Sequence, residues 1–525
     1  NRLRGDVVCL LRFVVNLHQD GHKPVQLFEQ TYSGKKWASA EVDLSAYAGQ
    51  MVRLELDTST RGKEREVEAA WAEPDLVREG KRPVLTAFPK DKLAKNIIYI
   101  LADASRQDVY KAMNPEAAYP TPAVSTLAEG GVTFAHAYTP ANWTLPSVVG
   151  LFTGQYPHSL SPELKMSEMF KLPGTVPVLA EHLQKQGFET AALVTNPFVS
   201  APFGLKRGWD TFHNYALKNG GHTHAEYLYG QAGKWLKERK DKEKPFFLYV
   251  HSMDTHDPYR LHPETKDHFK GTYQGQLKGK AMVNADINNK RSPIYRKLTE
   301  EDKRWVRALY DGEVTFHDTQ LNTFLELLQE EGIMENTLIV YSNDHGEELW
   351  DHGGLDHGHA MYQEQVKSPL VMHYPALFKP GTRVDRQVEL LDVTPTLLEA
   401  VGAPAMPGTH GVSLRGAIES DDGEWPYVLM SGNQLTVIVG QFKLFGSLKR
   451  GKLFNLTKDP KEKQNLISTH PIARRACEVY LGEGSSVPNK RLRLTSAGTD
   501  SAHKAEKVVL DEKLRQQLEA LGYME

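Results

Sequence analysis

The feature of the sequence that most restricts its fold is a series of short apolar runs separated by amphipathic segments. An apolar run without polar interruptions is typical of a strand that is buried on both faces. The segments between the runs fit amphipathic helices, in which apolar residues recur every three to four positions. This alternation predicts an α/β fold with a doubly wound, mostly parallel sheet that is covered by helices on both faces. The predicted strands are Asn96–Ala102, Thr190–Val194, Phe246–Val250 and Leu338–Tyr341, and the predicted helices are Thr175–Gln186, Glu226–Arg239 and Leu298–Glu331, with a candidate break at Gly312.

The chain has 525 residues, which is more than one compact core usually holds, so we expect two or three domains. Near the start, short runs of alternating apolar residues predict strands at Pro24–Tyr32, Trp37–Leu44, Met51–Asp57 and Val67–Trp71. We expect that the native N-terminus is missing. The predicted domains are an all-β sandwich, truncated, at 1–80, a linker at 81–95, the α/β domain at 96–424, and a C-terminal subdomain with a small antiparallel sheet and a terminal helix at 425–525.

The composition argues against some classes of partner. The formal net charge of −3 arises from 63 basic and 66 acidic residues, which does not favour nucleic acid or an anionic membrane surface. The apolar run Val7–Val15 contains Arg12 and is shorter than the roughly 20 residues of a membrane span, so it predicts a buried strand. Cys9 and Cys477 have no metal-type spacing, and they do not settle the compartment.

Acidic residues and histidines follow directly after three of the predicted strands. In a doubly wound sheet, ligands bind beyond the carboxyl ends of the strands, so we expect these side chains to converge. Carboxylate and imidazole groups together are ligands of catalytic metals such as zinc or manganese. One such Asp alone would more often be a turn former, but the whole set indicates a metal site. The set comprises Asp103 after the first strand, His251, Asp254 and His256 after the third, Asp344, His345, Glu347 and Glu348 after the fourth, and His352, His357 and His359 on the following loop.

Three neighbouring side chains permit two roles each. Arg106 either binds substrate or forms a salt bridge with Asp108. Asn196, at the end of the second strand, either contacts substrate or forms a turn. His251 either supports a metal ligand or packs at the strand end. The residues alone do not choose between these readings.

A second signal is a hydroxyl group at the start of an apolar helix. The segment Asn142–Ser147 (NWTLPS) contains Thr144 and continues into the apolar run Val148–Thr153. The N-terminus of a helix directs backbone N–H groups at an anion, so Thr144 is a candidate to act on an anionic ester. The alternative is that Thr144 is only the N-cap of the helix.

These motifs resemble successive blocks of the sulfatases, in the order that the family has them. The resemblance runs from about residue 94 to the C-terminus and implies a large α/β domain followed by a smaller antiparallel sheet. We therefore identify the chain as similar to the sulfatase family of the alkaline phosphatase superfamily. The matching segments are Asn96–Asp103, Thr121–Pro122 with Leu127–Phe134, Thr144–Ser147 with Leu151–Pro157, Ser342–Glu348, Ser368–Leu370, Asp392–Leu398 and Leu453–Leu466.

The resemblance implies a role for particular residues. It implies a divalent metal ion, either zinc, calcium or manganese, with one ion expected and two permitted. It also implies an anionic ester substrate, either a small molecule or a glycan, and a periplasmic or extracellular location. Position by position, Asp103, Asp344 and His345 correspond to metal ligands, Thr144 to the nucleophile, His256 to a contact with the ester or the leaving group, and His359 to a residue that binds substrate or metal.

Three departures from the family pattern bear on the chemistry. Sulfatases carry Cys or Ser in a C/S-x-P-x-R motif and oxidise it to formylglycine, whereas this chain has Thr144 and Val148 at those positions. Oxidation of a secondary alcohol gives a ketone, so formylglycine cannot form from Thr144. The family's Lys-x-His segment is replaced at 195–197, and His345 stands where many sulfatases have Asn. These changes favour the phosphoesterase and phosphotransferase branches.

We therefore predict a hydrolase of sulfate or phosphate esters that forms a covalent threonine ester. Asp103, Asp344, His345 and the Thr144 hydroxyl would hold one metal, which activates the hydroxyl. The alternatives are a transferase of phospho-groups to a glycan or lipid and a non-catalytic glycan-binding protein. The candidates for a second metal or for substrate binding are Asp254, His256, His359, His251, Asn196 and Arg106, although the short spacing of Asp254 and His256 argues against a second metal.

Overall fold

The chain forms two compact units in the computed structural model. One unit comprises residues 1–82 and 437–482, and the other comprises residues 83–436 and 483–525. Residues 437–482 thus belong with the N-terminal part of the chain, whereas the sequence predicted them within a C-terminal subdomain. The structure describes residues 10–32, 38–61, 71, 88–160, 169–216, 224–269, 271–275, 277, 298–419, 427–432, 434–446, 451–486, 506–508 and 510–520.

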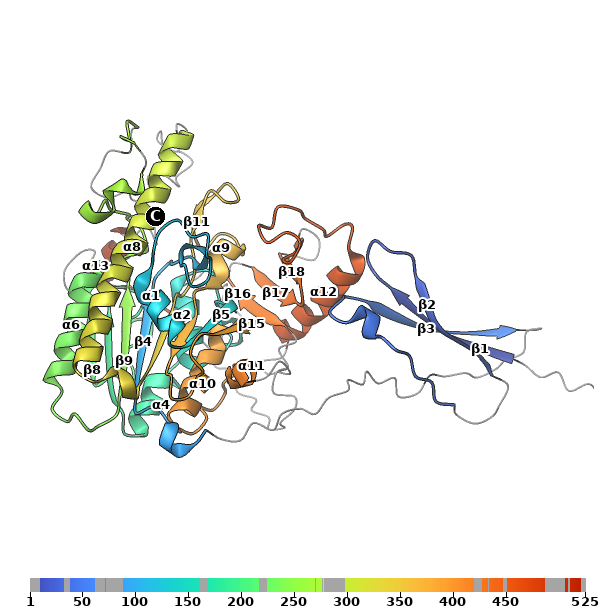
Figure 1. The fold of residues 1–525 in the computed structure, drawn as a ribbon, viewed down its shortest axis with the longest axis horizontal. Coiled ribbons are helices and arrows are strands. Elements are labelled where there is room, and N and C mark those ends of the chain that lie inside the picture. Colours follow the sequence, from blue (N-terminus) through green and yellow to red (C-terminus); the bar gives the residue numbers. More distant parts are fainter. Residues whose placement is uncertain are drawn as a thin grey trace, which may run out of the picture. The chain divides into compact units, whose positions relative to one another are not determined.

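A nine-stranded sheet forms the centre of the larger unit (Figure 1). Parallel pairing joins β10 to β4, β4 to β9, β9 to β7 and β7 to β8, while β14 is antiparallel to its neighbours. The mostly parallel sheet predicted from the apolar runs is confirmed. In order, the strands are β13 (Lys367–Ser368), β5 (Val132–Tyr138), β14 (Val371–His373), β10 (Thr337–Ser342), β4 (Asn96–Ala102), β9 (Phe246–Ser252), β7 (Glu189–Val194) and β8 (Thr211–Asn214), with β15 (Thr382–Glu389) paired to β5.

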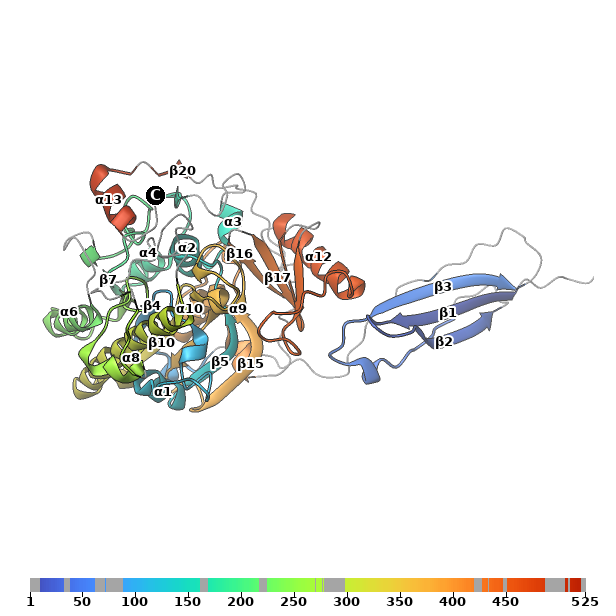
Figure 2. The same cartoon turned by 90° about the horizontal axis from the view of Figure 1, so that it is seen from above.

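Helices cover both faces of this sheet. All seven residues of β4 are buried, and they alternate between two cores: Ile97 faces the core with α2 and α4, and Ile98 faces the core with α1, α6 and α8. Figure 2 shows α2 and α4 on one side of the strands and α1 and α8 on the other. The helices of this unit are α1 (Pro122–Glu129), α2 (Thr144–Thr153), α3 (Pro157–Leu160), α4 (Leu179–Lys185), α6 (Ala225–Glu238), α8 (Glu300–Glu330), α9 (Gln363–Val366), α10 (Val393–Ala400), α11 (Arg415–Glu419) and α13 (Glu512–Ala520).

Helix α8 runs unbroken, so the candidate break at Gly312 is wrong. The glycine is inside the helix because another segment packs closely against it: an added Cβ would lie 2.8 Å from Thr265 Oγ1. The helix begins with a capping box, in which Asp302 N donates to Thr299 Oγ1 and the Asp302 side chain accepts from Thr299 N. Close approach, and not flexibility, therefore explains the glycine.

Helix α4 begins later than predicted. The sequence placed its start at Thr175, whereas the helix spans Leu179–Lys185 and its N-cap is Val178, in an extended conformation. The residue before a proline is disfavoured in helical conformation, so Pro177 holds Val176 outside the helix.

The first residues of the smaller unit form a three-stranded antiparallel sheet, β2–β1–β3. Of the four strands predicted near the start, Trp37–Leu44 has no strand among its described residues, and most of Val67–Trp71 lies outside the described residues. The described part of 1–80 contains this single sheet, so a sandwich stays a prediction. The strands are β1 (Leu10–His18), β2 (Val25–Tyr32) and β3 (Arg53–Arg61).

A small antiparallel sheet near the C-terminus is confirmed. It has the order β16–β17–β18–β19, and β18 pairs with β19 in antiparallel register. Helix α12 follows, and the Asp20 carboxylate accepts hydrogen bonds from Ile472 N and Ala473 N in its first turn. The elements are β16 (Val428–Ser431), β17 (Leu435–Val439), β18 (Phe442–Phe445), β19 (Lys452–Asn455) and α12 (Pro471–Ser486); the short pairs are β11 (Glu348–Leu349) with β12 (Leu355–Asp356), and β6 (Phe170–Lys171) with β20 (Glu506–Lys507).

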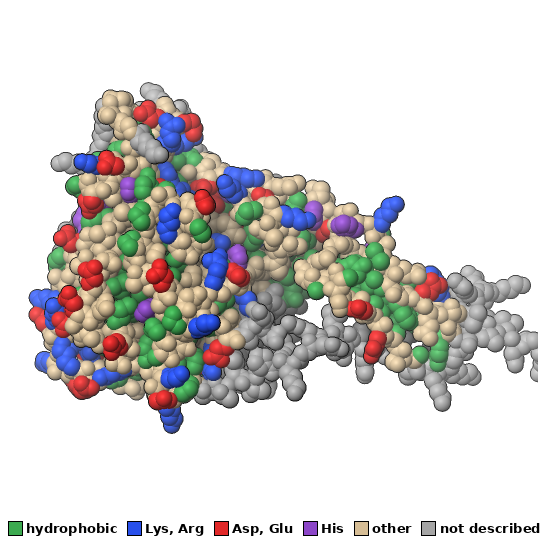
Figure 3. All heavy atoms as spheres, viewed as in Figure 1, with side chains coloured by type: hydrophobic (Ala, Val, Ile, Leu, Met, Phe, Trp, Pro, Cys, Tyr) green, Lys and Arg blue, Asp and Glu red, His purple; other side chains and the backbone are tan. Residues whose placement is uncertain are grey.

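The surface carries charges of both signs. On the face in Figure 3, Lys and Arg side chains are interspersed with Asp and Glu. Within the described ranges, no helix is both long and apolar enough to cross a membrane. The periplasmic or extracellular location and the absence of a nucleic-acid partner stay predictions.

A buried histidine makes stability depend on pH. His317, inside α8, is fully buried and lies 3.0 Å from the Tyr229 hydroxyl through Nε2, and burial lowers its pKa to about 4. Because the folded pKa is below the unfolded value, its contribution to stability is complete above about pH 6.5 and is lost as pH falls towards 4. Urea unfolding of wild type and His317→Gln at several pH values should show wild type losing about 3 kcal/mol more over this range. His22→Gln, at an exposed position, is the control and should change this pH dependence little. If the free energy of unfolding varies with pH in the same way in wild type and His317→Gln, His317 is not the cause of the loss.

Candidate metal centre and nucleophile

The predicted site residues lie at the carboxyl ends of three adjacent strands. Asp103 follows β4, Asp344 and His345 follow β10, and His251 lies near the end of β9. Because β10, β4 and β9 are neighbours and run parallel, these side chains meet at one edge of the sheet. All four side chains are buried.

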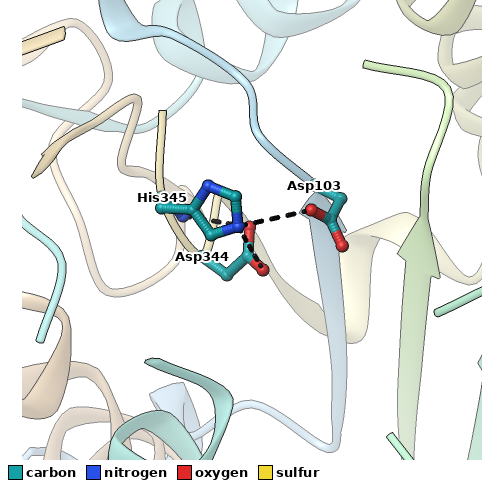
Figure 4. Close-up of side chains that lie close together, drawn as sticks. All are labelled: Asp103, Asp344 and His345. Carbon is teal, nitrogen blue, oxygen red and sulfur yellow. Dashed lines mark hydrogen bonds and ion pairs between the residues drawn. The ribbon is translucent and has the colours of Figure 1, made fainter. Parts of the chain in front are cut away.

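Asp103, Asp344 and His345 converge on one point (Figure 4). His345 Nε2 lies 3.6 Å from Asp103 Oδ1 and 3.5 Å from Asp344 Oδ2. One ligand atom from each residue lies within 4.8 Å of the others. Two residues brought by one strand and one brought by its neighbour thus form a compact group of potential metal ligands.

Each carboxylate has one oxygen that is held by the protein and one that is not. Asp103 Oδ2 lies 2.8 Å from His251 Nε2 and accepts from Asn196 Nδ2 at 2.6 Å, and Asp344 Oδ1 accepts from the backbone N–H of Ala104 and of His345. Asp103 Oδ1 and Asp344 Oδ2 are buried without a hydrogen-bond partner. An unsatisfied buried acceptor is costly, so two of them facing each other require a ligand or a shared proton.

His345 presents a lone pair to the same point. Its Nδ1 lies 2.9 Å from the carbonyl oxygen of Gly346, which can only accept, so Nδ1 carries the proton and Nε2 is the acceptor in the neutral ring. Burial lowers the pKa of His345 well below its usual value, which favours that neutral ring. Burial, and then the charge of Asp103, raise the pKa of Asp344. Two carboxylate oxygens and an imidazole nitrogen, all acceptors, fit a divalent cation, which would remove the need for a proton on Asp344.

Thr144 lies beside this group at the start of α2. Its Oγ1 is 3.2 Å from His345 Nε2 and 3.5 Å from Asn196 Nδ2, and the residue is fully buried. The N-cap of α2 is Trp143, which makes no side-chain cap hydrogen bond, so Thr144 is the first residue of the helix and not its cap. Its hydroxyl is therefore directed to the candidate metal ligands and not to the helix backbone.

His256 and His357 form a second layer around the centre. The ring centroids of His256 and His357 lie 4.9 Å apart, and those of His357 and His345 lie 4.1 Å apart. Burial opposes protonation of His256, but Asp257, whose Oδ1 is 2.8 Å from Nδ1, raises the pKa of His256 to about 10. The charge of Asp356 likewise raises the pKa of His357 above its usual value although burial lowers it. Protonated imidazoles at this position suit an anionic ester.

Sequence reasoning noted His357 on its loop but gave it no role. The loop contacts the segment just before Thr144 through the backbone, because Gly358 N donates to Asn142 O at 2.9 Å. His357 Nδ1 also lies 3.3 Å from Glu347 Oε1, and Glu347 accepts from the Tyr259 hydroxyl at 2.8 Å. In the sequence, the adjacent acid and imidazole of Asp356 and His357 were the one sign of a functional role. Only the folded loop shows that His357 lies beside His345.

Asp254, His359 and Arg106 point to other partners. The Asp254 carboxylate accepts from Ala225 N at the start of α6, and Arg106 binds Asp108 and Asp351, each through two nitrogens. His359 Nε2 lies 2.8 Å from Glu348 Oε2, and its side chain is 41% exposed. The salt bridge that was one reading of Arg106 is present, and the structure does not gather Asp254, His256 and His359 into one ligand set.

His251 and Asn196 act on Asp103. His251 lies between Tyr249 and Asp103, with Nδ1 3.0 Å from the Tyr249 hydroxyl and Nε2 2.8 Å from Asp103 Oδ2. Asn196 Nδ2 donates to the same oxygen at 2.6 Å, and its Oδ1 accepts from Phe198 N. The two residues fix one oxygen of Asp103 and so turn the other towards His345.

Comparison with known proteins decides the family. The sulfatase family model matches residues 95–403, more than half of the chain. The chain belongs to the sulfatase family. A second model, described as the C-terminal part of N-sulphoglucosamine sulphohydrolase, matches residues 351–478. The resemblance to the alkaline phosphatase superfamily and the α/β fold expected from it are therefore confirmed.

The known proteins to which the chain is similar differ in what they are named for. An arylsulfatase of Clostridium perfringens is 28% identical over 45% of this chain and 52% of its own length, so the match spans about half of that relative. An N-acetylglucosamine-6-O-sulfatase of Bacteroides thetaiotaomicron is 21% identical over 68% of this chain and 80% of its own. The solved phosphonate monoester hydrolase of Agrobacterium radiobacter has a TM-score of 0.61 and 18% identity, and covers 74% of this chain and 96% of its own, so the likeness is one of fold.

The geometry predicts which carboxylates bind metal. Asp344→Asn should lose the bound cation, because the amide has no negative charge and cannot balance a divalent ion in a buried site. Asp254→Asn should keep it, because Asp254 contacts α6 and not the converging ligand atoms. Elemental analysis of both purified variants, with circular dichroism to confirm folding, measures the difference. A folded Asp344→Asn variant with full metal content would contradict this placement.

Proposed function

We propose that the chain is a metal-dependent hydrolase of sulfate or phosphate esters with Thr144 as its nucleophile. The observation that carries the proposal is the convergence of three acceptor atoms, from Asp103, Asp344 and His345, beside the Thr144 hydroxyl, whose Oγ1 lies 3.2 Å from His345 Nε2. Two of these acceptors, Asp103 Oδ1 and Asp344 Oδ2, are buried without a hydrogen-bond partner, which destabilises a fold unless a ligand binds them. A cation bound between these atoms would satisfy both oxygens and the imidazole nitrogen.

A divalent cation held by these residues would lower the pKa of a hydroxyl ligand and neutralise charge on the ester oxygens. Asn196 Nδ2 donates to Thr144 Oγ1 at 3.5 Å and steadies it for attack. Helix α2 begins at Thr144, so the free backbone N–H groups of its first turn lie near the Thr144 hydroxyl, where they favour an anion. With two carboxylates, one imidazole and one hydroxyl, the ligand set suits zinc or manganese better than calcium, which prefers oxygen.

The reaction needs a proton donor and then a proton acceptor. A cation held here would make Thr144 react in its deprotonated form, with the hydroxyl proton released to solvent. When this Oγ1 bonds to sulfur or phosphorus, the ester oxygen leaves and takes a proton from His256, which carries one because its pKa is raised. Water then attacks the threonine ester, His256 takes a proton from that water, and Thr144 Oγ1 leaves in the deprotonated form that began the cycle. This second half is required because threonine cannot release its ester by collapse of a hemiacetal, as formylglycine can.

The substrate class that fits is an ester of a sugar or another small alcohol. The protonated His256 and His357 beside the centre favour a group with negative charge. Two comparisons support a sugar: one relative is named an N-acetylglucosamine-6-O-sulfatase, and the C-terminal family model is named for an N-sulphoglucosamine sulphohydrolase. A sulfated or phosphorylated glycan is therefore the proposed substrate.

Two variants of the nucleophile test the proposal. Thr144→Val keeps the branched shape but removes the hydroxyl, and it should lower kcat by about a thousandfold or more. Thr144→Ser keeps the hydroxyl and should retain activity within about tenfold, since only one methyl group is lost. Mass spectrometry of wild type quenched during turnover should find one sulfuryl or phosphoryl group on the peptide that contains Thr144. Wild-type turnover by Thr144→Val would remove Thr144 from the mechanism.

Chelation and a substrate panel test the metal and the ester. Aryl sulfate, phosphate monoester and phosphodiester substrates should be assayed before and after dialysis against a chelator, followed by zinc, manganese or calcium. Activity should disappear on chelation and return with zinc or manganese, because the hydroxyl is activated through the cation. Full activity in protein that elemental analysis finds metal-free would refute metal dependence.

A further inference from the structure

Helix α8 carries a buried carboxylate that the proposed mechanism does not use. Glu313 is fully buried in the middle of the helix, next to Gly312. Its Oε1 accepts from the backbone N–H of Arg260 at 2.6 Å, and its Oε2 lies 2.7 Å from His262 Nε2. The Arg260 guanidinium contacts His224 Nε2 at 2.6 Å instead, so Glu313 holds Arg260 by its backbone. A buried carboxylate is costly unless its oxygens are satisfied, and here one short segment satisfies both.

That segment leads back to His256, the proton donor of the proposed mechanism. It lies between β9 and the short 3₁₀ helix η4 (Pro263–His268). We call residues His256–His262 the His256 segment. Three residues separate His256 from Arg260, and one of them is Pro258, whose ring fixes its backbone angle φ. The position of the Arg260 backbone is therefore passed to His256 through a short and stiff stretch of chain.

A hydrogen bond from Tyr259 anchors the middle of the His256 segment. Its hydroxyl donates to Glu347 Oε2 at 2.8 Å, and Glu347 lies two residues after His345. Beyond this point the side chain of Leu261 is 49% exposed, so its burial does not hold the segment in place. The two contacts of Glu313 therefore fix the far end of the segment.

Helix α8 is shaped to receive this far end. The His262 ring stacks on Phe316, one turn after Glu313, with centroids 4.0 Å apart. His262 is also the N-cap of η4, and its carbonyl oxygen accepts from Thr265 N at 3.1 Å. Gly312 leaves the space for Thr265, since a Cβ there would lie 2.8 Å from Thr265 Oγ1. Gly312, Glu313 and Phe316 thus form one face of α8 on which the end of the His256 segment docks.

We propose that Glu313 is a positioning residue that places His256 where it can donate a proton to the leaving ester oxygen. Glu313 fixes the Arg260 backbone, and Asp257, 2.8 Å from His256 Nδ1, orients the ring. The His256 ring is thereby kept 4.9 Å from that of His357. Both oxygens of Glu313 are taken up by the segment, so it acts through His256 and not on the substrate. The inference rests on the proposed function, which gives His256 its role.

Esters that differ in their leaving group test this role. The 6-sulfate and 6-phosphate of N-acetylglucosamine release an alkyl alcohol, which needs a proton to leave, whereas 4-nitrophenol leaves as an anion without one. On the sugar ester that wild type hydrolyses, Glu313→Ala should lower kcat about a hundredfold, because a displacement of about 1 Å can cost that much. On the 4-nitrophenyl ester of the same acid, the loss of kcat should stay within about threefold.

A second buried carboxylate of α8 supplies the matched control. Asp318 is fully buried like Glu313, but it accepts from Ala123 N and Val124 N at the start of α1. Asp318→Asn should lower the stability of the fold and keep the ratio of kcat on the two esters at the wild-type value. Equal losses on both esters in Glu313→Ala would show that Glu313 supports the fold and does not position His256.

Further variants keep the test independent of how well Glu313→Ala folds. Glu313→Gln should recover most of the lost kcat, because the amide oxygen still accepts from Arg260 N and the amide N–H can donate to His262. His262→Gln, which leaves α8 unchanged, should show the same preference between esters at a smaller size. In a His256→Ala background, Glu313→Ala should cause no further loss on the sugar ester, because the residue that it positions is absent. A further loss there would overturn the inference.

A spectroscopic measurement separates this inference from the proposed function. In protein labelled with ¹³C-histidine, the ring signal of His256 is the one that is missing from His256→Gln. It should shift or broaden in Glu313→Ala and stay in place in Asp318→Asn. If wild type hydrolyses neither ester but the signal responds in this way, the proposed function fails and the placement of His256 by Glu313 stands. If Thr144→Val is inactive as expected but the signal is unchanged in Glu313→Ala, the placement fails and the proposed function stands.

Discussion

The structure of the larger unit depends on an electrostatic constraint: two buried carboxylates and one imidazole lone pair face a single point. Each oxygen that turns away from that point is held by the protein, Asp103 Oδ2 by His251 and Asn196, and Asp344 Oδ1 by backbone N–H groups. The remaining atoms can only repel one another unless a positive charge lies between them. A divalent cation bound at this point would offset the free energy that the buried charges cost.

The sheet makes this arrangement possible. Strands β10, β4 and β9 are neighbours and parallel, so residues that lie far apart in the chain end at one edge. The interior of each strand is apolar and supports two separate cores, which fixes the strand register through packing. Polar chemistry is therefore confined to the strand ends, where it does not weaken the cores.

Threonine at the nucleophile position changes what the rest of the site must do. In the mechanism that we propose, the covalent ester of Thr144 is released only by an external attack, so the site needs a group that moves protons beside the candidate metal ligands. His256 and His357, whose rings lie 4.9 Å apart, stand at that position. His357 comes from a loop that also binds the backbone next to Thr144, through Gly358 and Asn142. The loop that carries His357 is thus linked to the segment that leads to Thr144.

Much of the fold was evident from the sequence, because apolar periodicity reports burial and burial determines elements in this class of fold. The runs at 96–102 and 246–250 were found at nearly the observed bounds, and a small antiparallel sheet was expected near the C-terminus, where it is present. Helix starts were less certain: α4 begins after Pro177, and Gly312 lies within an unbroken helix because Thr265 packs against it. A glycine required by close approach looks the same in sequence as one that ends a helix.

The sequence by itself determined the family resemblance, the α/β class and the identity of the residues that end the strands, since these follow from local composition and order. Only the tertiary structure decided which of those residues face one another. It placed Thr144 beside His345, turned Asp254 to α6 and His359 to Glu348, and brought His357 to the centre. The reason is physical. Polar residues that follow a buried strand look alike in the local sequence, whereas the direction of each side chain is set by hydrogen bonds to segments that are remote in the chain.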